Sequence, residues 1–308
     1  MAEAAPLVDG LLQLPLPAAL WAALIEPFAE FAFMRRGAVA CLALALAAAP
    51  LGCWLIVRRM SLVGDALSHA VLPGAAAGFW LAGLSLPAMS LGGFFAALMV
   101  ALGAGFITRR TAQREDAAFA ALYLVALALG VLLVSLRGSP VDLMHLLFGS
   151  VLAVDRVALL MMAGVASLTL LGLALIWRPL ALETADPGFL RHVRGPAALA
   201  HAALLVMVVA NLVSAFQALG TLMAVGLMML PAAAARFWAA SLIGQCATAA
   251  GIGTLAGLGG LLWSWHAELP SGPCIVLLCG AVYGASVMAG RRDSLLRRWM
   301  LAHAHRVA

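Results

Sequence analysis

The chain has 308 residues, of which 65% are hydrophobic and only 10% are charged, and its mean hydropathy is +1.07. Soluble globular domains are about a quarter charged, so the composition excludes that class and predicts an integral membrane protein. All 18 basic residues are arginine. A phosphate-binding GxxxxGK[ST] loop requires a lysine, so the chain cannot hydrolyse ATP by that route on its own. The net charge of +5 comes from arginine clusters at the ends of apolar runs, which does not predict nucleic-acid binding.

Residues 1–36 form an N-terminal segment that we expect outside the membrane or at its surface. It has no basic residue before Arg35, which is unlike a cleaved signal peptide. The part from 16 to 34 contains two prolines and two glutamates, Pro17, Glu26, Pro27 and Glu30. These residues predict an interfacial helix rather than a membrane-crossing one.

Residues 37–290 read as one membrane domain made of crossing helices. A crossing helix needs about 20 predominantly apolar residues. Such runs occupy residues 38–57, 62–83, 87–107, 117–136, 157–177, 239–262 and 273–290. The stretch 197–235 carries no formal charge and is long enough for two crossings that turn near Gly220. The sequence therefore predicts an all-α polytopic membrane protein with eight or nine transmembrane helices.

The arginines predict the orientation of these helices. Most of them fall on one side of the predicted membrane domain, with Arg35, Arg36 and Arg156 as the main exceptions. Because basic residues are enriched in cytoplasmic loops, that side is expected in the cytoplasm. The basic tail, 291–308, and the C-terminus would then be cytoplasmic and the N-terminus external.

Two ionisable residues stand inside the second predicted crossing. Asp65 and His69 are four residues apart, so they share one face of a helix. A carboxylate inside a membrane costs about 2.5–3.5 kcal/mol on the insertion scale and usually faces a cavity or a partner. A carboxylate oxygen and an imidazole nitrogen can bind one divalent cation together. The alternative is that Asp65 caps the helix and His69 is a buried histidine bonded to it.

Other polar residues have weaker claims to a role. Asp142 and His145 share a face of a predicted short external helix within 139–155, and His266 and Glu268 lie in a predicted external loop. These residues either help to receive a cation or form ordinary surface pairs. Residues 183–199 are the longest polar stretch of the interior. They predict a short capped cytoplasmic helix, which either docks on another protein or is a solvated loop.

The segment "RRMSLVGDALSHAVLPGAAAGF", residues 58–79, resembles the signature of the membrane subunits of metal-uptake ABC transporters. That family imports zinc, manganese or iron in bacteria. Residues 114–135, 142–152, 217–237 and 268–277 resemble further family segments in the same order. Together these matches cover nearly everything from about residue 30 to 290.

The resemblance implies a fold similar to that of the vitamin B12-type, or type II, importer permeases. It also implies a homodimer of this chain with two ATP-binding cassette subunits and a periplasmic or surface-anchored metal-binding protein. The metal in transit would contact Asp65 and His69. The stretch "ADPGFLRHVRG", within 183–197, would be the coupling helix that docks on the ATPase, through Asp186, Pro187, Phe189, Arg191 and Gly195. Leu190 and Arg194 depart from the usual family pattern there.

From these observations we expect the permease subunit of a zinc importer in the bacterial inner membrane. Manganese and iron are the alternative cargoes of the same family. A proton-coupled secondary carrier that uses Asp65 and His69 as a relay is a further alternative, and it would work without an ATPase. No HExxH motif occurs at any of the seven histidines, so an intramembrane metalloprotease is a poor reading. No permanently bound cofactor is expected, and ATP would bind the partner subunit.

Overall fold

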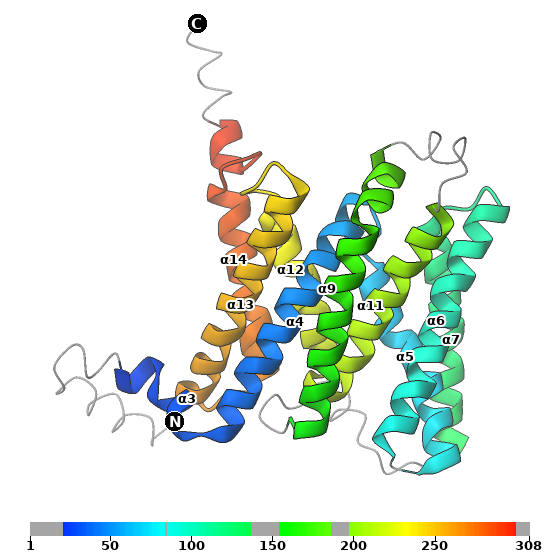
Figure 1. Cartoon of the computed structure of the whole chain (residues 1–308), viewed down its shortest axis with the longest axis horizontal. Coiled ribbons are helices and arrows are strands. Elements are labelled where there is room, and N and C mark those ends of the chain that lie inside the picture. Colours follow the sequence, from blue (N-terminus) through cyan, green and yellow to red (C-terminus); the bar gives the residue numbers. More distant parts are fainter. Residues whose placement is uncertain (1–20, 84, 137–153, 186–196, 300–308) are drawn as a thin grey trace, which may run out of the picture.

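The computed structural model describes residues 21–83, 85–136, 154–185 and 197–299, and these residues form helices and no strand. Successive long helices run in alternating directions and pack into one bundle (Figure 1). The helices are α3 (Glu26–Glu30), α4 (Ala32–Val57), α5 (Val63–Ala82), α6 (Leu86–Arg110), α7 (Glu115–Leu136), α9 (Arg156–Ala185), α11 (Ala197–Leu219), α12 (Thr221–Ala235), α13 (Leu242–Ala267) and α14 (Ser271–Ala289).

Seven helices in the described ranges are long and apolar enough to cross a membrane, namely α4, α6, α7, α9, α11, α13 and α14. The helices α5 and α12 run alongside them in the same bundle (Figure 1). Together they make nine helices in the described ranges, the upper figure of the eight or nine that the sequence predicts. The helix α12 has 15 residues. At 1.5 Å per residue it is shorter than the roughly 30 Å hydrocarbon core.

The predicted turn near Gly220 is confirmed. Gly220 separates α11 from α12 and has a φ angle of 85°. Residues that carry a side chain rarely adopt a positive φ angle of this kind, so glycine suits the position. The chain can therefore reverse within a single residue between two helices.

The N-terminal part differs in detail from the predicted interfacial helix. Two helices, α3 and α4, meet at Phe31, and α4 begins at Ala32. The helix α4 therefore extends five residues before the expected start of the membrane domain at residue 37. Arg36 lies near the first turn of α4 and donates a hydrogen bond to the carbonyl oxygen of Val154, just before α9.

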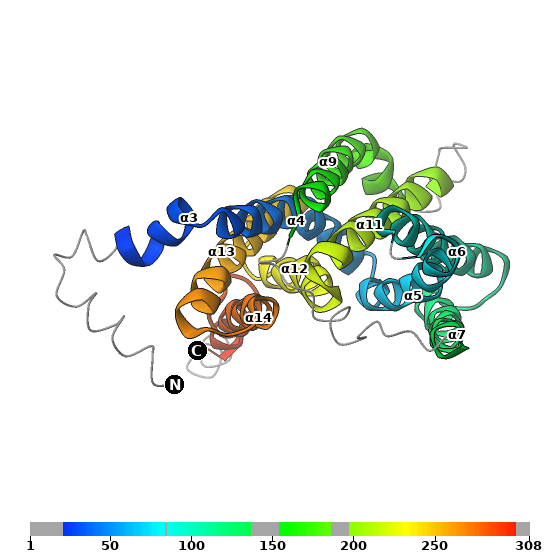
Figure 2. The ribbon, with the colours of Figure 1, turned by 90° about the horizontal axis from the view of Figure 1, so that it is seen from below.

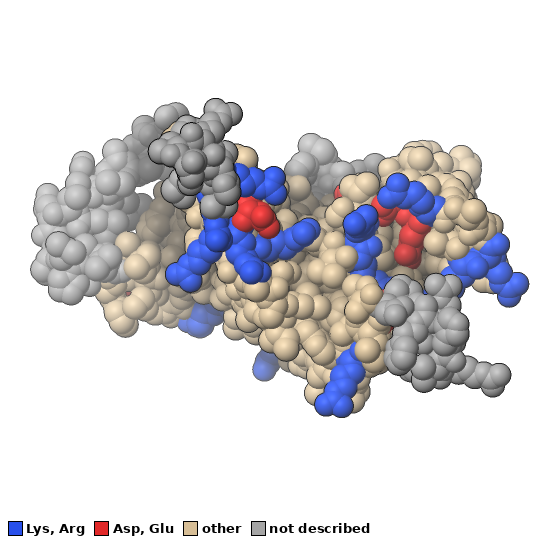
Figure 3. Space-filling view, turned by 90° about the horizontal axis from the view of Figure 1, so that it is seen from above, with Lys and Arg blue, Asp and Glu red and all other residues tan. Residues whose placement is uncertain are grey.

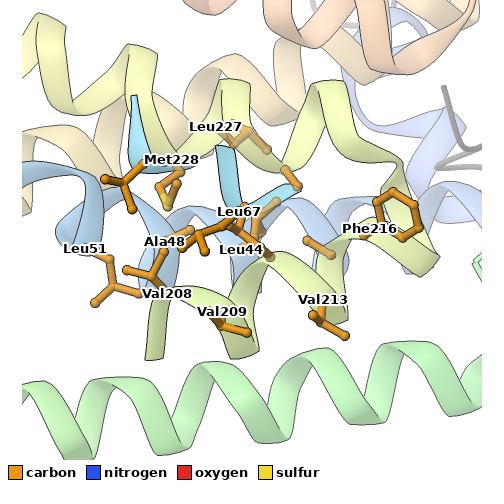
Figure 4. Close-up of a cluster of buried hydrophobic side chains, with 14 of the residues drawn as sticks. Leu44, Ala48, Leu51, Leu67, Val208, Val209, Val213, Phe216, Leu227 and Met228 are labelled. Atoms are coloured by element: carbon orange, nitrogen blue, oxygen red, sulfur yellow. The ribbon is translucent and has the colours of Figure 1, made fainter. Parts of the chain in front are cut away.

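The helix α4 is the most deeply buried of the seven crossing helices. It is apolar and rich in alanine on every side, which is the pattern of a helix surrounded by other helices. Its neighbours include α9, α12 and α13. Figure 4 shows the core where α4, α5, α11 and α12 meet, and the labelled side chains are Leu44, Ala48, Leu51, Leu67, Val208, Val209, Val213, Phe216, Leu227 and Met228.

The helices α5 and α6 approach each other so closely that only glycine fits. A Cβ atom added to Gly74 would overlap the carbonyl oxygen of Gly92, and one added to Gly78 would overlap the carbonyl oxygen of Ala88. Small residues at helix contacts are typical of membrane bundles, because backbone contact there replaces the hydrophobic effect. The position of α5 is therefore set by α6.

Basic side chains gather at one end of the bundle. Figure 3 shows this face, where arginines surround a few acidic side chains. From the helix bounds, the arginines at this end are Arg58, Arg59, Arg109, Arg110, Arg114, Arg178, Arg236, Arg291, Arg292, Arg297 and Arg298. We call this face the arginine face. Seen along the bundle from the opposite end (Figure 2), α14, α12, α5 and α7 lie along one long side of the molecule, and α9 lies on the other.

Candidate functional site

The helix α5 starts directly after a tight turn that follows α4. Its N-cap is Leu62, and no side chain caps this end. Asp65 lies in the first turn of α5, where its backbone carbonyl accepts a hydrogen bond from the hydroxyl of Ser68 at 2.7 Å. The interpretation of Asp65 as a helix cap is therefore wrong, because α5 begins two residues earlier, at Val63.

Asp65 and His69 lie side by side, as their spacing predicts. The carboxylate Oδ1 is 3.8 Å from the imidazole Nε2. That distance is too long for a hydrogen bond, which also contradicts the bonded pair of the alternative interpretation. It is short enough for one ion to contact both atoms at about 2.0–2.2 Å, the usual distance for zinc. The pair is thus spaced as two ligands of one cation would be.

The pair opens into a pocket between α5, α12 and α14. The pocket has a volume of about 360 Å³, and its lining is mostly apolar. Its residues are Asp65, Ser68, His69, Thr221, Leu222, Val225, Gly226 and Val276. The helix α5 starts at the arginine face, whereas α14 starts at the opposite end of the bundle (Figure 1). Because both helices contribute residues from their first two turns, the pocket lies between the two faces.

Tyr123 of α7 stacks against His69. The ring centroids are 6.3 Å apart, and the ring planes differ by 30°. Sequence reasoning did not single out this residue, because the contact joins two helices that are distant in the chain. Tyr123 limits the directions that the imidazole can take. It therefore helps to aim the ring at the pocket.

One copy of the chain supplies only two side chains for a cation here. Among the described residues no group of three or more His, Cys, Asp or Glu side chains could hold a metal ion. The side chain of Asp65 is 64% exposed and that of His69 is 34% exposed. Divalent metals take at least four ligands, so the remaining ones would come from water or from another chain.

The structure does not bring His266 and Glu268 to this pocket. His266 and Glu268 are at the far end of α13 from the arginine face, where the ring Nε2 of His266 is 2.9 Å from the carbonyl oxygen of Ala23. Glu268 ends α13 with a φ angle of 54°. Asp142, His145, Asp186, Pro187, Phe189, Arg191 and Gly195 lie outside the described residues.

A bundle with seven described helices that are long and apolar enough to cross a membrane is the architecture of a multi-pass membrane protein. Residues 30–290 match the ABC 3 transport family. The chain belongs to this family.

Relatives of known name carry out metal transport. The chain is 34% identical over 253 residues to the manganese import system permease protein ScaB of Streptococcus parasanguinis, covering 82% of this chain and 89% of that one. It is 30% identical over 259 residues to the chelated iron transport system membrane protein YfeD of Yersinia pestis, covering 84% and 86%. Among solved structures, PsaBC from Streptococcus pneumoniae in complex with Fab superposes with a TM-score of 0.75 at 29% identity, covering 89% of this chain and 98% of that one.

Proposed function

We propose that this chain is the membrane-spanning subunit of an ATP-driven importer that carries Mn²⁺ into a bacterial cell. The observation that carries the proposal is the Asp65–His69 pair, spaced for one cation and facing the pocket between α5, α12 and α14. A carboxylate and an imidazole suit manganese, iron and zinc alike. We favour manganese over the zinc that the sequence analysis expected, because relatives with this fold are named for manganese and iron.

The proposed energy source is a separate pair of ATPase subunits. The chain has no lysine for a phosphate-binding loop of its own. The ATPases would dock on the arginine face, through residues 183–197, and that face would be cytoplasmic by the positive-inside rule. A metal-binding protein would deliver the cation at the opposite face. The membrane would be the bacterial inner membrane.

A second copy of the chain would complete the transport path. The carboxylate of Asp65 is mostly exposed on the single copy. Facing lipid, it would cost about 2.5–3.5 kcal/mol. A second copy packed on the side formed by α14, α12, α5 and α7 would cover it, and two Asp65–His69 pairs would then give four ligands. Such a site would bind the cation only weakly, which suits transport, because a site that binds its ion tightly would not release it.

Uptake of radiolabelled Mn²⁺, Fe²⁺ and Zn²⁺ tests the proposal. Cells that lack their own importers would express this chain with its ATPase and binding protein, as wild type, His69→Ala or Asp65→Asn. His305→Ala is the matched control, because this histidine of the C-terminal tail has no role in the proposal. We expect Mn²⁺ uptake that needs an active ATPase, is lost in both site variants and persists in the control.

Each other outcome changes a named part of the proposal. Uptake of Zn²⁺ or Fe²⁺ with the same dependence would keep the mechanism and correct the cargo. Metal uptake without an ATPase would instead establish the secondary carrier. Equal uptake by His69→Ala and the wild type would show that this histidine only packs in the bundle.

A further inference from the structure

A second pocket lies at the arginine face, where the short helix α12 ends. It has a volume of about 890 Å³, and its walls come from the ends of α4, α12 and α14, the start of α13 and the chain that follows α14. Four charged side chains line it, namely Arg236, Arg292, Arg298 and Asp293. We call it the arginine pocket. Its lining shares no residue with the pocket of the metal pair, among the residues that the structure describes.

The arginine pocket carries an excess of positive charge. Three guanidinium groups and one carboxylate line it, so two of the positive charges have no counter-charge within the lining. The carboxylate of Asp293 is 3.9 Å from Arg298, and the two side chains are 84% and 71% exposed. An exposed pair of this kind contributes little. Within the described part of the chain, the guanidinium groups of Arg236 and Arg292 make no hydrogen bond or ion pair.

The backbone that carries two of these arginines is held in place. The backbone N–H of Arg292 donates a hydrogen bond to the carbonyl oxygen of Phe237 at 2.9 Å, which joins the chain after α14 to the turn that begins at Arg236. The indole N–H of Trp238 donates to the hydroxyl of Ser286 at 2.9 Å, which joins the same turn to α14. Arg236 and Arg292 are therefore brought together before any ligand binds, which lowers the entropic cost of binding.

The charge of the arginine pocket selects the class of ligand. A divalent cation is repelled by the uncompensated arginines, so this pocket does not extend the cation site. Guanidinium groups hold phosphate oxygens through paired, charge-assisted hydrogen bonds. Basic pockets between membrane helices bind phosphate-bearing lipid headgroups in the same way.

The rest of the lining suits a phosphate group that is attached to a larger molecule. Tyr283 and Gln245 add a hydroxyl and an amide, which can donate further hydrogen bonds. Met229, Leu230 and Leu295 form an apolar part of the wall. A ligand with a charged phosphate and an uncharged remainder would therefore meet both kinds of surface in one pocket.

We propose that the arginine pocket binds a phosphate group, supplied by the headgroup of an anionic phospholipid or by a soluble phosphate ester. Arg236 and Arg292 hold the phosphate oxygens, and the more mobile pair of Arg298 with Asp293 sets the charge at the rim. The inference stands apart from the proposed function, because it needs neither the metal pair nor an ATPase.

Isothermal titration of the full chain, purified in an uncharged detergent, tests this site with two probes. Dioctanoyl phosphatidylglycerol carries the phosphate on a lipid, and glycerol phosphate carries it on a soluble molecule. Binding of phosphatidylglycerol alone assigns the site to a lipid headgroup. Binding of both probes with similar affinity assigns it to a soluble phosphate ester.

The variants change the charge of the pocket in both directions. Arg236→Gln and Arg292→Gln each remove one guanidinium group and leave the backbone hydrogen bond of Arg292 in place. Asp293→Asn removes the carboxylate at a residue with a φ angle of 49°, a conformation that asparagine tolerates well. Arg178→Gln is the matched control, because it makes the same change of charge on α9, outside the arginine pocket.

We expect the wild type to bind at least one probe, and each of Arg236→Gln and Arg292→Gln to bind it about tenfold more weakly, because a hydrogen bond to a charged group is lost. Asp293→Asn should bind about threefold more tightly, since a like charge is removed from an exposed site. Damage to the fold would not produce such a gain. Arg178→Gln should bind like the wild type.

Three results would overturn the inference. The first is a wild type that binds neither probe. The second is an equal affinity in the wild type, Arg236→Gln and Arg292→Gln, or an equal loss in Arg178→Gln, which would reflect the charge of the whole face. The third is a pair of pocket variants that bind both probes normally but no longer co-purify with an ATPase subunit, which would assign the pocket to protein docking.

Discussion

His69 is aimed at the pocket by a neighbour from another helix. Its ring stacks on Tyr123, whereas the carboxylate of Asp65 is 3.8 Å away and makes no hydrogen bond to it. Groups that orient a metal-binding histidine commonly change metal affinity tenfold to a hundredfold when they are removed. The stack therefore belongs to the proposed site together with Asp65 and His69.

Two substitutions of Tyr123 distinguish the effect of its aromatic ring from the effect of its hydroxyl group. We expect Tyr123→Ala to weaken Mn²⁺ binding about tenfold or more, since the imidazole loses the surface that limits its rotation. Tyr123→Phe keeps that surface and should bind Mn²⁺ like the wild type. Isothermal titration of the purified transporter with Mn²⁺ measures both. Equal affinity in Tyr123→Ala would show that the stack does not orient His69.

Residue positions were predictable only where the signal is local. Asp65 and His69 follow from a spacing of four within one helix, and the structure brings them together. The contact of Tyr123 with His69 could not be predicted in the same way, because it joins segments that are far apart in the chain. A polar side chain within an apolar helix is also a local signal of a contact between helices. The side chain of Asn211 in α11 donates a hydrogen bond to Thr169 of α9 at 2.6 Å.

At the scale of helices, the contact between α5 and α6 positions the helix that carries Asp65 and His69. Gly74 of α5 lies directly against the backbone of Gly92 of α6. Close backbone approach of this kind tolerates no side chain, because the obstacle is a carbonyl group and cannot rotate away. The helix that carries Asp65 and His69 is thus fixed along its second half.

Adding a single methyl group at Gly74 tests this contact between α5 and α6. Gly74→Ala places a Cβ atom on the carbonyl oxygen of Gly92, so we expect a loss of about 1–3 kcal/mol of stability, as for other overpacked sites. The midpoint of thermal unfolding in detergent should fall. Gly164→Ala on α9 is the control, because nothing lies within 4 Å of a Cβ atom there. Equal midpoints for the two variants would show that α5 and α6 separate without cost.

Helix positions were predictable to within a few residues because charges and glycines bound the apolar runs. The predicted crossing at 62–83 is α5 at Val63–Ala82, and the turn at Gly220 separates α11 from α12. The start of α4 was predicted too late, since Arg35 and Arg36 looked like a boundary but lie inside the helix. An arginine at a helix end can bond to nearby carbonyls, as Arg35 does to Ala29 at 2.6 Å, and so does not end the helix.

At the scale of the whole molecule, the two long sides differ in chemistry. The side formed by α14, α12, α5 and α7 contains the pocket with the mostly exposed Asp65 (Figure 2). The opposite side, where α9 lies, exposes leucines such as Leu168 and Leu175. Lipid tails suit the second surface, whereas on the first the carboxylate of Asp65 is costly to leave in lipid. The molecule therefore has one side for lipid and one side that we expect a second copy to cover.

Cysteine cross-linking in native membranes tests that arrangement. All five native cysteines are buried, so an introduced cysteine will be the reactive one. Leu222→Cys, at the pocket and 41% exposed, should give a cross-linked dimer with bis-maleimide linkers. Leu175→Cys on α9 is 82% exposed and should remain a monomer on denaturing gels, because it faces lipid. Dimers from Leu175→Cys alone would put the second copy on the other side, leave Asp65 facing lipid and remove the four-ligand path.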